Sequence, residues 1–318
     1  MFGRRHDGKK LKDIDGFFRM ASMFVGRTRV EATNYMYLDY STKKMDEYIA
    51  AKKLEGLDYT YADIFLACLI RVFYLRPRLN RFIVNGHFYQ RHGIVVSMAL
   101  HKNLKTGEQE TTCKCRFTGK ETIQEIKEMW HKTIESTLSG DNATDNFTGG
   151  ALGRMPTWIL KIIVGTLRKL DKWGMLSGKF IDNVSPFHCS IFFANMKSVH
   201  LGPHLHHLYN FGTCGFMCAL GKEEWRAGVN PETGEVFPEQ YISMGVSEDE
   251  RFIDGLTYAN VVKTVSRMID NLSVLERAPE DDEIRHPVNS YQLAKEAKRA
   301  AKQEKKDAKR AKKGHVEA

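Results

Sequence analysis

Two stretches of the chain concentrate side chains that can do chemistry. The first is the charged segment Glu250-Arg-Phe-Ile-Asp-Gly255, which contains Arg251 and Asp254. It follows a short run of strand-forming residues, Ile242–Val246, and a polar turn. After it, apolar residues recur with a helical period. A charged loop between a strand and a returning helix lies where clefts open, so we expect this segment to line a site.

The second stretch is a run of imidazoles. Four histidines lie close together, at His200, His204, His206 and His207. Two cysteines follow in a Cys-x-x-x-Cys spacing that begins at Cys214. Ordinary zinc sites pair their cysteines differently, so we predict no metal here. Two roles for these histidines remain open. One of them could act as a general base, or all of them could simply line a loop or an interface.

Helices and strands alternate along the chain, which indicates an α/β or α+β fold with a mixed sheet. A helix is predicted after a cap at Ser41 or Thr42, with Met45, Tyr48 and Ile49 on one face. Further helices are predicted within 64–75, 121–136 and 156–176 and after 256, and strands at 34–39, 81–84, 87–90, 94–100, 111–117, 190–194, 216–220 and 240–246. Asn85-Gly86 predicts a tight hairpin between two of these strands. Thr60 and Asp63 predict a capping box for the helix at 64–75, which we expect to be buried.

Much of the basic charge belongs to a C-terminal tail. Residues 291–318 carry +6 of the formal net charge of +9, which leaves +3 on the other 290 residues. The tail mixes acidic residues with the basic ones and has no aromatic residue after Tyr291 to stack on bases, so we expect no nucleic-acid binding. We predict one domain over residues 1–285 and a disordered or helical tail over 286–318.

The chain begins with polar and basic residues and has no apolar run of the roughly 20 residues that a membrane span needs. Its six cysteines are scattered through a large chain, which is typical of reduced thiols. We therefore expect a cytoplasmic protein.

Several segments together resemble the acyltransferase catalytic domain of 2-oxo acid dehydrogenase complexes, within the chloramphenicol-acetyltransferase-like superfamily. Asp63–Asn80 resembles that family's buried helix and "P-x-L-N" turn. Ser190–Asn195 resembles its "F-T-I-S-N" strand, and Glu250–Gly255 its "H-R-x-x-D-G" motif. The order of the elements agrees over roughly residues 20–278.

The resemblance implies a two-layer α/β sandwich with a mixed sheet and helices on one face. It implies a homotrimer with active sites at subunit interfaces, and coenzyme A or an acyl-coenzyme A as substrate. We expect no lipoyl group on this chain, because the family's lipoyl and subunit-binding modules are not found. In the family, the motif histidine deprotonates the acceptor and a hydroxyl stabilises the oxyanion. The motif aspartate orients the loop through an arginine, so Arg251 and Asp254 are expected to pair.

This sequence departs from the family at the centre of that mechanism. Glu250 stands at the histidine position and Ala194 at the serine position, while Asn195 is kept as a candidate oxyanion donor. A carboxylate is a weaker base than imidazole, but burial in an apolar channel raises a carboxyl pKa. The base is then Glu250, or His206 or His207 from the imidazole run.

An apparent insertion at about 138–185 contains an amphipathic stretch, Pro156–Leu176, with two tryptophans and interspersed basic residues. This stretch suits a helix that packs on the sandwich or covers the channel. It also suits a helix that lies in a membrane interface.

The sequence thus supports two functions. The first is acyl transfer from a coenzyme A or carrier thioester to an unidentified thiol, hydroxyl or amine. The second is a non-catalytic trimeric scaffold or ligand-binding protein, because both the histidine and the hydroxyl of the motif are replaced.

Overall fold

The computed structural model describes residues 5–102, 110–140, 152, 155–230 and 232–280. The chain divides into two units, Met1–Ile284 and Arg285–Ala318. The predicted basic tail lies outside the described residues, as does most of the loop predicted before the amphipathic stretch.

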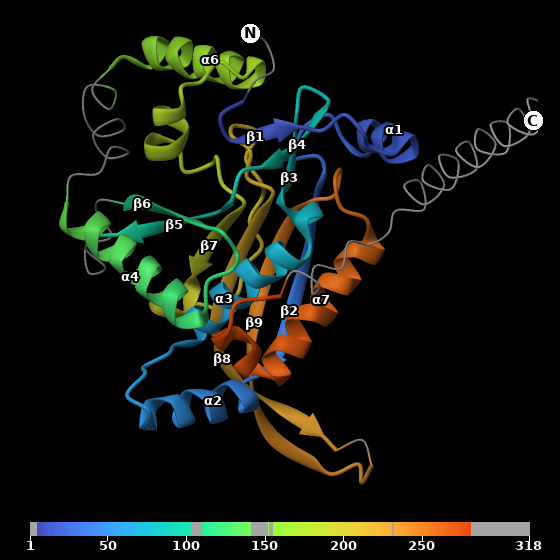
Figure 1. Ribbon diagram of the computed structural model, residues 1–318, viewed down its shortest axis with the longest axis vertical. Helices are drawn as coiled ribbons and strands as arrows, with labels where there is room; N and C mark the ends of the chain where they lie inside the picture. The colour runs from blue at the N-terminus through green and yellow to red at the C-terminus, as the bar shows by residue number, and fades with distance from the viewer. Residues whose placement is uncertain (1–4, 103–109, 141–151, 153–154, 231, 281–318) are drawn as a thin grey trace, which may run out of the picture. The chain divides into compact units, whose positions relative to one another are not determined.

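The first unit is built on a six-stranded mixed sheet (Figure 1). Its order is β2-β9-β8-β7-β5-β6, in which β7 runs parallel to both of its neighbours and the other pairs are antiparallel. The strands are β2 (Thr33–Ser41), β5 (Ile94–His101), β6 (Glu110–Phe117), β7 (Ile191–Asn195), β8 (Phe216–Val229) and β9 (Val236–Asp249). A smaller antiparallel sheet, β1-β4-β3, contains β1 (Gly8–Lys10), β3 (Arg81–Val84) and β4 (His87–Arg91).

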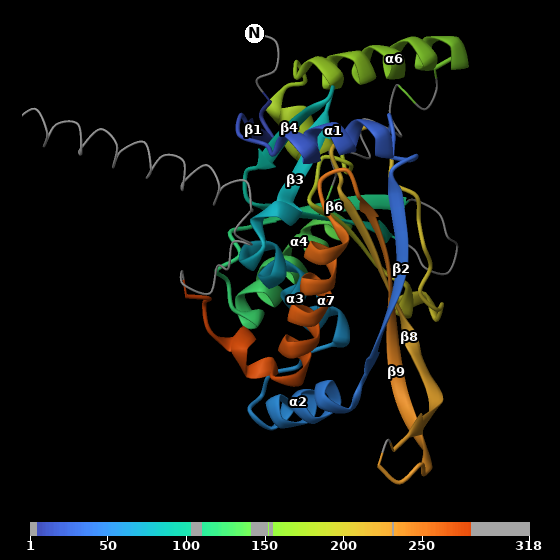
Figure 2. The same ribbon diagram turned by 90° about the vertical axis from the view of Figure 1, so that its right-hand side faces the viewer.

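Helices cover one face of the large sheet, as Figure 2 shows. They are α2 (Lys43–Leu54), α3 (Tyr61–Leu75), α4 (Ile123–Ser139) and α7 (Gly255–Asp270). Their apolar sides and this sheet face form the principal core, which includes Phe65, Phe193 and Met244. The predicted two-layer α/β sandwich with a mixed sheet and helices on one face is confirmed.

The buried helix predicted at 64–75 is α3. It begins with the predicted capping box, in which Thr60 Oγ1 accepts a hydrogen bond from the Asp63 N–H and the Asp63 carboxylate accepts one from the Thr60 N–H. Twelve of its 15 residues are buried, so it lies between layers as expected. The predicted hairpin is β3–β4, and Asn85 (φ 51°) and Gly86 (φ 72°) adopt the left-handed conformations that its two-residue turn needs.

Strands β8 and β9 are much longer than predicted. Residues 225–229 and 236–240 pair beyond the end of β2 and form a two-stranded arm (Figure 2). Residues 247–249, predicted as part of a turn, belong to β9 and pair with β2. That prediction was wrong because polar side chains are buried there, among them Glu248 and Asp249.

Two helices, α1 (Gly16–Val25) and α6 (Thr157–Trp173), lie at one end of the first unit (Figures 1 and 2). Of these, α1 packs Phe18 against the principal core, and α6 is the predicted amphipathic stretch. Among the residues of α6 only Asp171 is buried, and none of its apolar side chains belongs to the core clusters. The helix therefore adds no apolar side chain to the core clusters of the sandwich, and its predicted role stays a prediction.

Polar contacts instead hold α6 to the body. The Asp171 carboxylate accepts hydrogen bonds from Arg5 Nη2 at 2.8 Å, His188 Nε2 at 3.1 Å and the Gly212 N–H at 3.1 Å. Arg5 also donates to both carboxylate oxygens of Asp7. These buried contacts join α6 to the N-terminal segment and to the loop before β8.

Candidate active site

A pocket of about 490 Å³ opens where the ends of β5 and β7 meet β8 and the loop 200–213. We call it the histidine pocket. Most of its wall is apolar and comes from the three strands and from Leu138 of α4. Its polar lining is confined to a few side chains, which include Asn195, His101, Ser198, His204, His206 and Tyr209. An apolar cavity with a few convergent polar groups is the usual form of a small-molecule site.

The loop that carries the histidines lies directly on the sheet. It crosses β8 at Gly221 and β9 at Gly245, where a Cβ atom would collide with the backbone of Pro203 and His204 respectively. Glycine at these two positions permits the close approach. The contact fixes the height of the loop above the sheet and so positions His204 and His206 at the pocket.

His206 is the imidazole best arranged to act as a base. Its Nδ1 lies 2.8 Å from the backbone carbonyl oxygen of His207, and since a carbonyl only accepts, Nδ1 carries the proton. The lone pair is therefore on Nε2. The ring is half-buried and lies 5.5 Å from that of Tyr209, whereas His207 is exposed. The structure thus distinguishes the two histidines that the sequence left as alternatives.

Asn195 lines the same pocket from the end of β7. Its Oδ1 is buried and has no hydrogen-bond partner among the described residues. A buried amide oxygen without a partner is costly, and a polar group of a ligand would satisfy it. Rotating the carboxamide by half a turn presents its NH₂ group in the same place, so the side chain can meet an acceptor as well as a donor.

Glu250 lies elsewhere. It is exposed, directly after β9, and its N–H donates to the carbonyl of Ala32. Asn195 pairs with Leu220 and Leu220 with Met244, so Glu250 is six residues further along β9, or roughly 20 Å away. Glu250 and Asn195 of one chain therefore do not line the same pocket.

The predicted ion pair between Arg251 and Asp254 is also wrong. Arg251 donates from Nε and Nη2 to the two carboxylate oxygens of Asp249, at 2.7 and 2.6 Å. Asp254 is instead the N-cap of α7 and accepts a hydrogen bond from the Thr257 N–H at 2.7 Å. The capping position turns the Asp254 carboxylate towards the helix, and the buried Asp249 is the nearer acid for Arg251.

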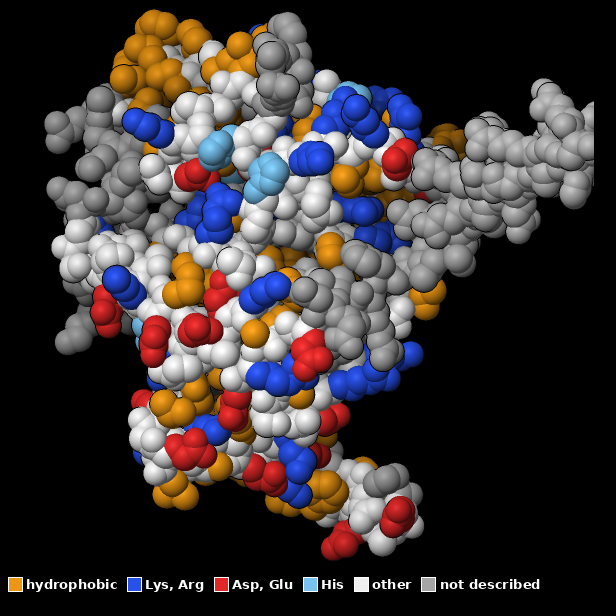
Figure 3. Space-filling view, viewed as in Figure 1, with side chains coloured by type: hydrophobic (Ala, Val, Ile, Leu, Met, Phe, Trp, Pro, Cys, Tyr) orange, Lys and Arg blue, Asp and Glu red, His pale blue; other side chains and the backbone are white. Residues whose placement is uncertain are grey.

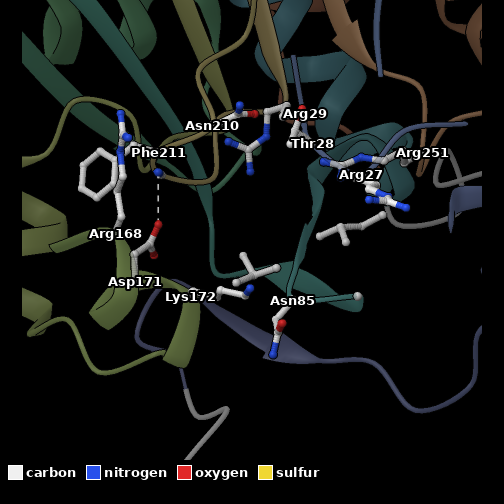
Figure 4. A pocket seen from close by; sticks show the side chains of 14 residues that line it. Arg27, Thr28, Arg29, Asn85, Arg168, Asp171, Lys172, Asn210, Phe211 and Arg251 are labelled. Atoms are coloured by element: carbon white, nitrogen blue, oxygen red, sulfur yellow. Dashed lines mark hydrogen bonds between the residues drawn. The ribbon is translucent and has the colours of Figure 1, made fainter. Parts of the chain in front are cut away.

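A second pocket of about 490 Å³ has a different character, and we call it the arginine pocket (Figure 4). Cationic side chains from three separate parts of the chain line it: Arg27, Arg29, Arg168, Lys172 and Arg251. Asp171 is an acid in its wall, but its carboxylate already binds Arg5 and His188. Sequence reasoning missed this pocket because no local motif joins residues so far apart.

The arginine pocket also contains buried charge. Burial lowers the pKa of the Arg29 guanidinium, which the Asp249 carboxylate at 3.6 Å opposes. Arg29 donates from Nη1 to the Tyr209 carbonyl at 2.7 Å. Because it also contacts Asp249, the last residue of β9, it connects the end of that strand to the loop that carries the histidines. The two pockets therefore lie on either side of one loop, with Tyr209 lining one and Asn210 the other.

Among the described residues, no cluster of three or more His, Cys, Asp or Glu side chains is arranged to hold a metal ion. None of the described helices has both the length and the apolar character to cross a bilayer.

No protein-family model and no curated protein matches this chain. Solved structures do. The dihydrolipoamide acetyltransferase of Azotobacter vinelandii superposes with a TM-score of 0.50 and 8% identity over 83% of this chain and 93% of that one. For that enzyme, one serine, one histidine and one asparagine were investigated for roles in its catalytic mechanism.

The cubic core of a pyruvate dehydrogenase multienzyme complex matches to a similar degree, with a TM-score of 0.50 and 9% identity over 83% and 93% of the two chains. A chloramphenicol acetyltransferase superposes with a TM-score of 0.47 and 11% identity, over 82% of this chain and 100% of that one. At these identities the likeness shows the fold alone. The chain has the chloramphenicol-acetyltransferase-like fold that the sequence resemblance implied.

Proposed function

We propose that this protein transfers an acyl group from a thioester of coenzyme A, or of a carrier, to a small thiol, hydroxyl or amine in the histidine pocket. The observation that carries the proposal is that His206 and Asn195 line one largely apolar pocket. The acyltransferase fold supports it. His206 replaces Glu250 as the base in this account.

The proposed reaction needs a base and an oxyanion donor. The acceptor attacks the thioester carbonyl carbon while His206 Nε2 takes its proton, and the C=O electron pair moves onto the oxygen. The Asn195 amide donates a hydrogen bond to that oxyanion. When the tetrahedral intermediate collapses, the C–S bond breaks and the leaving thiolate takes the proton back from His206.

The rate enhancement expected from these two groups is that of general-base and oxyanion catalysis. A positioned general base contributes about 10²–10⁴ in rate, and one oxyanion donor about 10²–10³. The apolar walls strengthen both interactions, because charges interact more strongly where water is excluded. A volume of about 490 Å³ suits the acyl chain and thioester, since small-molecule sites range from about 300 to 1,000 Å³.

We further propose that the protein assembles as a homotrimer. The resemblance to acyltransferase domains supports this, and in a trimer Glu250 would face a neighbouring copy rather than its own Asn195. The mass of the protein in solution tests the assembly, with an expected value three times the 36.5 kDa of one chain. Arg251 and Asp254 support the loop that presents Glu250.

A non-catalytic trimeric scaffold or ligand-binding protein is the second candidate. The replacement of the motif histidine by Glu250 and of the motif serine by Ala194 favours it. Both candidates can bind a thioester, but only the first turns it over.

Release of coenzyme A itself, separated by chromatography, from a panel of acyl-coenzyme A thioesters of increasing chain length distinguishes the two candidates. Each thioester is offered with thiol, hydroxyl and amine acceptors. Acceptor-dependent release that saturates with thioester is the expected result. The absence of release from every thioester and acceptor pair, together with saturable binding in calorimetry, would favour the ligand-binding protein.

A further inference from the structure

Helix α6 exposes several large apolar side chains, while others along it are half-buried. Trp158, Ile162 and Val164 are 65%, 60% and 44% exposed, and the helix contributes nothing to either apolar core cluster. Covering side chains of this size is worth about 1.5–3 kcal/mol each, so a helix of this kind is poorly suited to water. Figure 3 shows the resulting apolar surface at the upper end of the molecule.

Helix α1 adds a second apolar surface at the same end. Phe17 and Phe24 are 74% and 82% exposed, and Met20 and Met23 are also exposed. The other side of this helix is anchored, because Ser22 is buried and Phe18 packs against the principal core. Figures 1 and 2, which are turned by 90° relative to one another, both place α1 and α6 at this end. The two helices together make one apolar end, which we call the α1–α6 surface.

The charges on this surface have one sign. Helix α6 carries Lys161, Arg168, Lys169 and Lys172, and its acid, Asp171, is buried against Arg5 and His188. Helix α1 has one basic residue, Arg19, and no acid. Amphipathic helices with aromatic residues on one side and basic residues on the other bind anionic membrane interfaces.

The arginine pocket opens between these elements. Arg27 follows α1, and Arg168 and Lys172 belong to α6. In Figure 4 the labelled cationic side chains stand around a common space. Such a cluster of guanidinium and ammonium groups suits a phosphate, which they can meet through several charge-assisted hydrogen bonds.

We propose that the α1–α6 surface docks on an anionic phospholipid membrane, with the exposed aromatic and aliphatic side chains at the boundary of headgroups and acyl chains and a lipid phosphate in the arginine pocket. The protein then lies on the membrane without crossing it. This inference is independent of the proposed acyl transfer. It rests on the α1–α6 surface and the arginine pocket, whereas acyl transfer rests on the histidine pocket.

Flotation of the full chain with lipid vesicles tests the proposal. One set of vesicles is phosphatidylcholine alone, and the other contains phosphatidylglycerol. The apolar variant is Trp158→Ala/Ile162→Ala, and the pocket variant is Arg168→Gln/Lys172→Gln. Trp225→Ala is the matched control, because Trp225 is 70% exposed but lies on the arm of β8 and β9.

Binding to phosphatidylglycerol vesicles and not to phosphatidylcholine alone is the expected result. The apolar variant should bind at least about tenfold more weakly, and the pocket variant about tenfold more weakly, while Trp225→Ala binds as the wild type does. Unchanged binding of the apolar and pocket variants would assign any affinity to the basic tail and overturn the proposal. So would wild-type protein that binds no vesicles, or a Trp158→Ala/Ile162→Ala change that alters only self-association.

Discussion

Arg251 donates two hydrogen bonds to Asp249, two residues before it, at 2.7 and 2.6 Å. Both side chains are buried, and Arg29 approaches the same carboxylate at 3.6 Å. Asp254, the acid that the sequence motif would assign to Arg251, caps α7 instead. The loop between β9 and α7 is therefore held by two separate devices, a buried ion cluster and a helix cap.

The two devices should differ in their effect on stability. Asp249→Asn leaves two buried guanidinium groups without a carboxylate, and we expect a loss of about 3–5 kcal/mol in the free energy of unfolding. Asp254→Ala removes a helix cap and a part-exposed ion pair with Arg78 at 3.5 Å, and should lose only about 1–2 kcal/mol. Urea unfolding measures both. Equal losses, or the larger loss in Asp254→Ala, would contradict this assignment.

Glu248 should make the protein less stable as the pH rises. Burial raises the pKa of this carboxyl to about 8, and the nearby charges of Glu250 and Asp249 add to the shift. The unfolded chain loses the proton near pH 4.5 while the folded chain keeps it, so stability falls between about pH 4.5 and 8, by roughly 5 kcal/mol at most. Unfolding of Glu248→Gln across this range should show no such fall. Parallel pH profiles of the two proteins would refute the prediction.

Asp171 should act in the opposite direction, at acid pH. Burial alone would raise the pKa of this carboxyl, but hydrogen bonds from His188 and Arg5 outweigh it and lower the pKa to about 2. The stabilisation is present above the ordinary carboxyl pKa near 4 and is lost as the pH falls to about 2, by roughly 2 kcal/mol. We expect Asp171→Asn to be less stable than the wild type at neutral pH and the difference to shrink towards pH 2. A difference that stays constant with pH would show that the ionised carboxylate is not responsible.

Gly245 tests the position of the histidine loop without removing a polar group. In Gly245→Ala the new Cβ collides with the backbone of His204, so the loop that carries His206 must move. A displacement of about 1 Å in a catalytic group lowers the rate by up to about a hundredfold, and we expect kcat to fall while the protein stays folded. Gly165→Ala, with no atom near the added Cβ, is the matched control and should keep full activity. An unaffected kcat in Gly245→Ala would mean that the loop does not position the base.

Local signals in the sequence predicted the fold well. The capping box of Thr60 and Asp63 and the Asn85-Gly86 turn act over a few residues, and both were predicted correctly. The arm of β8 and β9 was not predicted. Its strands are largely exposed, so they lack the alternation of apolar and polar residues by which a half-buried strand is predicted. Its pairing is set by the continuation of the ladder from the sheet.

The sites were harder to predict because they join distant segments. The arginine pocket unites residues near positions 27, 170 and 251, and no spacing in the sequence indicates it. The preference for His206 over His207 depends on which ring is turned towards the pocket, and this is set by the loop crossing at Gly245. Neither feature has a local sequence signature.

The most direct test of the central claim is the rate of acceptor-dependent thiol release from the best thioester, compared between the wild type and three variants. His206→Gln should lower kcat by about 10²–10⁴, while His207→Gln and Glu250→Gln leave it unchanged and all three unfold like the wild type. Loss of activity in Glu250→Gln with full activity in His206→Gln would contradict the account and assign the base to Glu250.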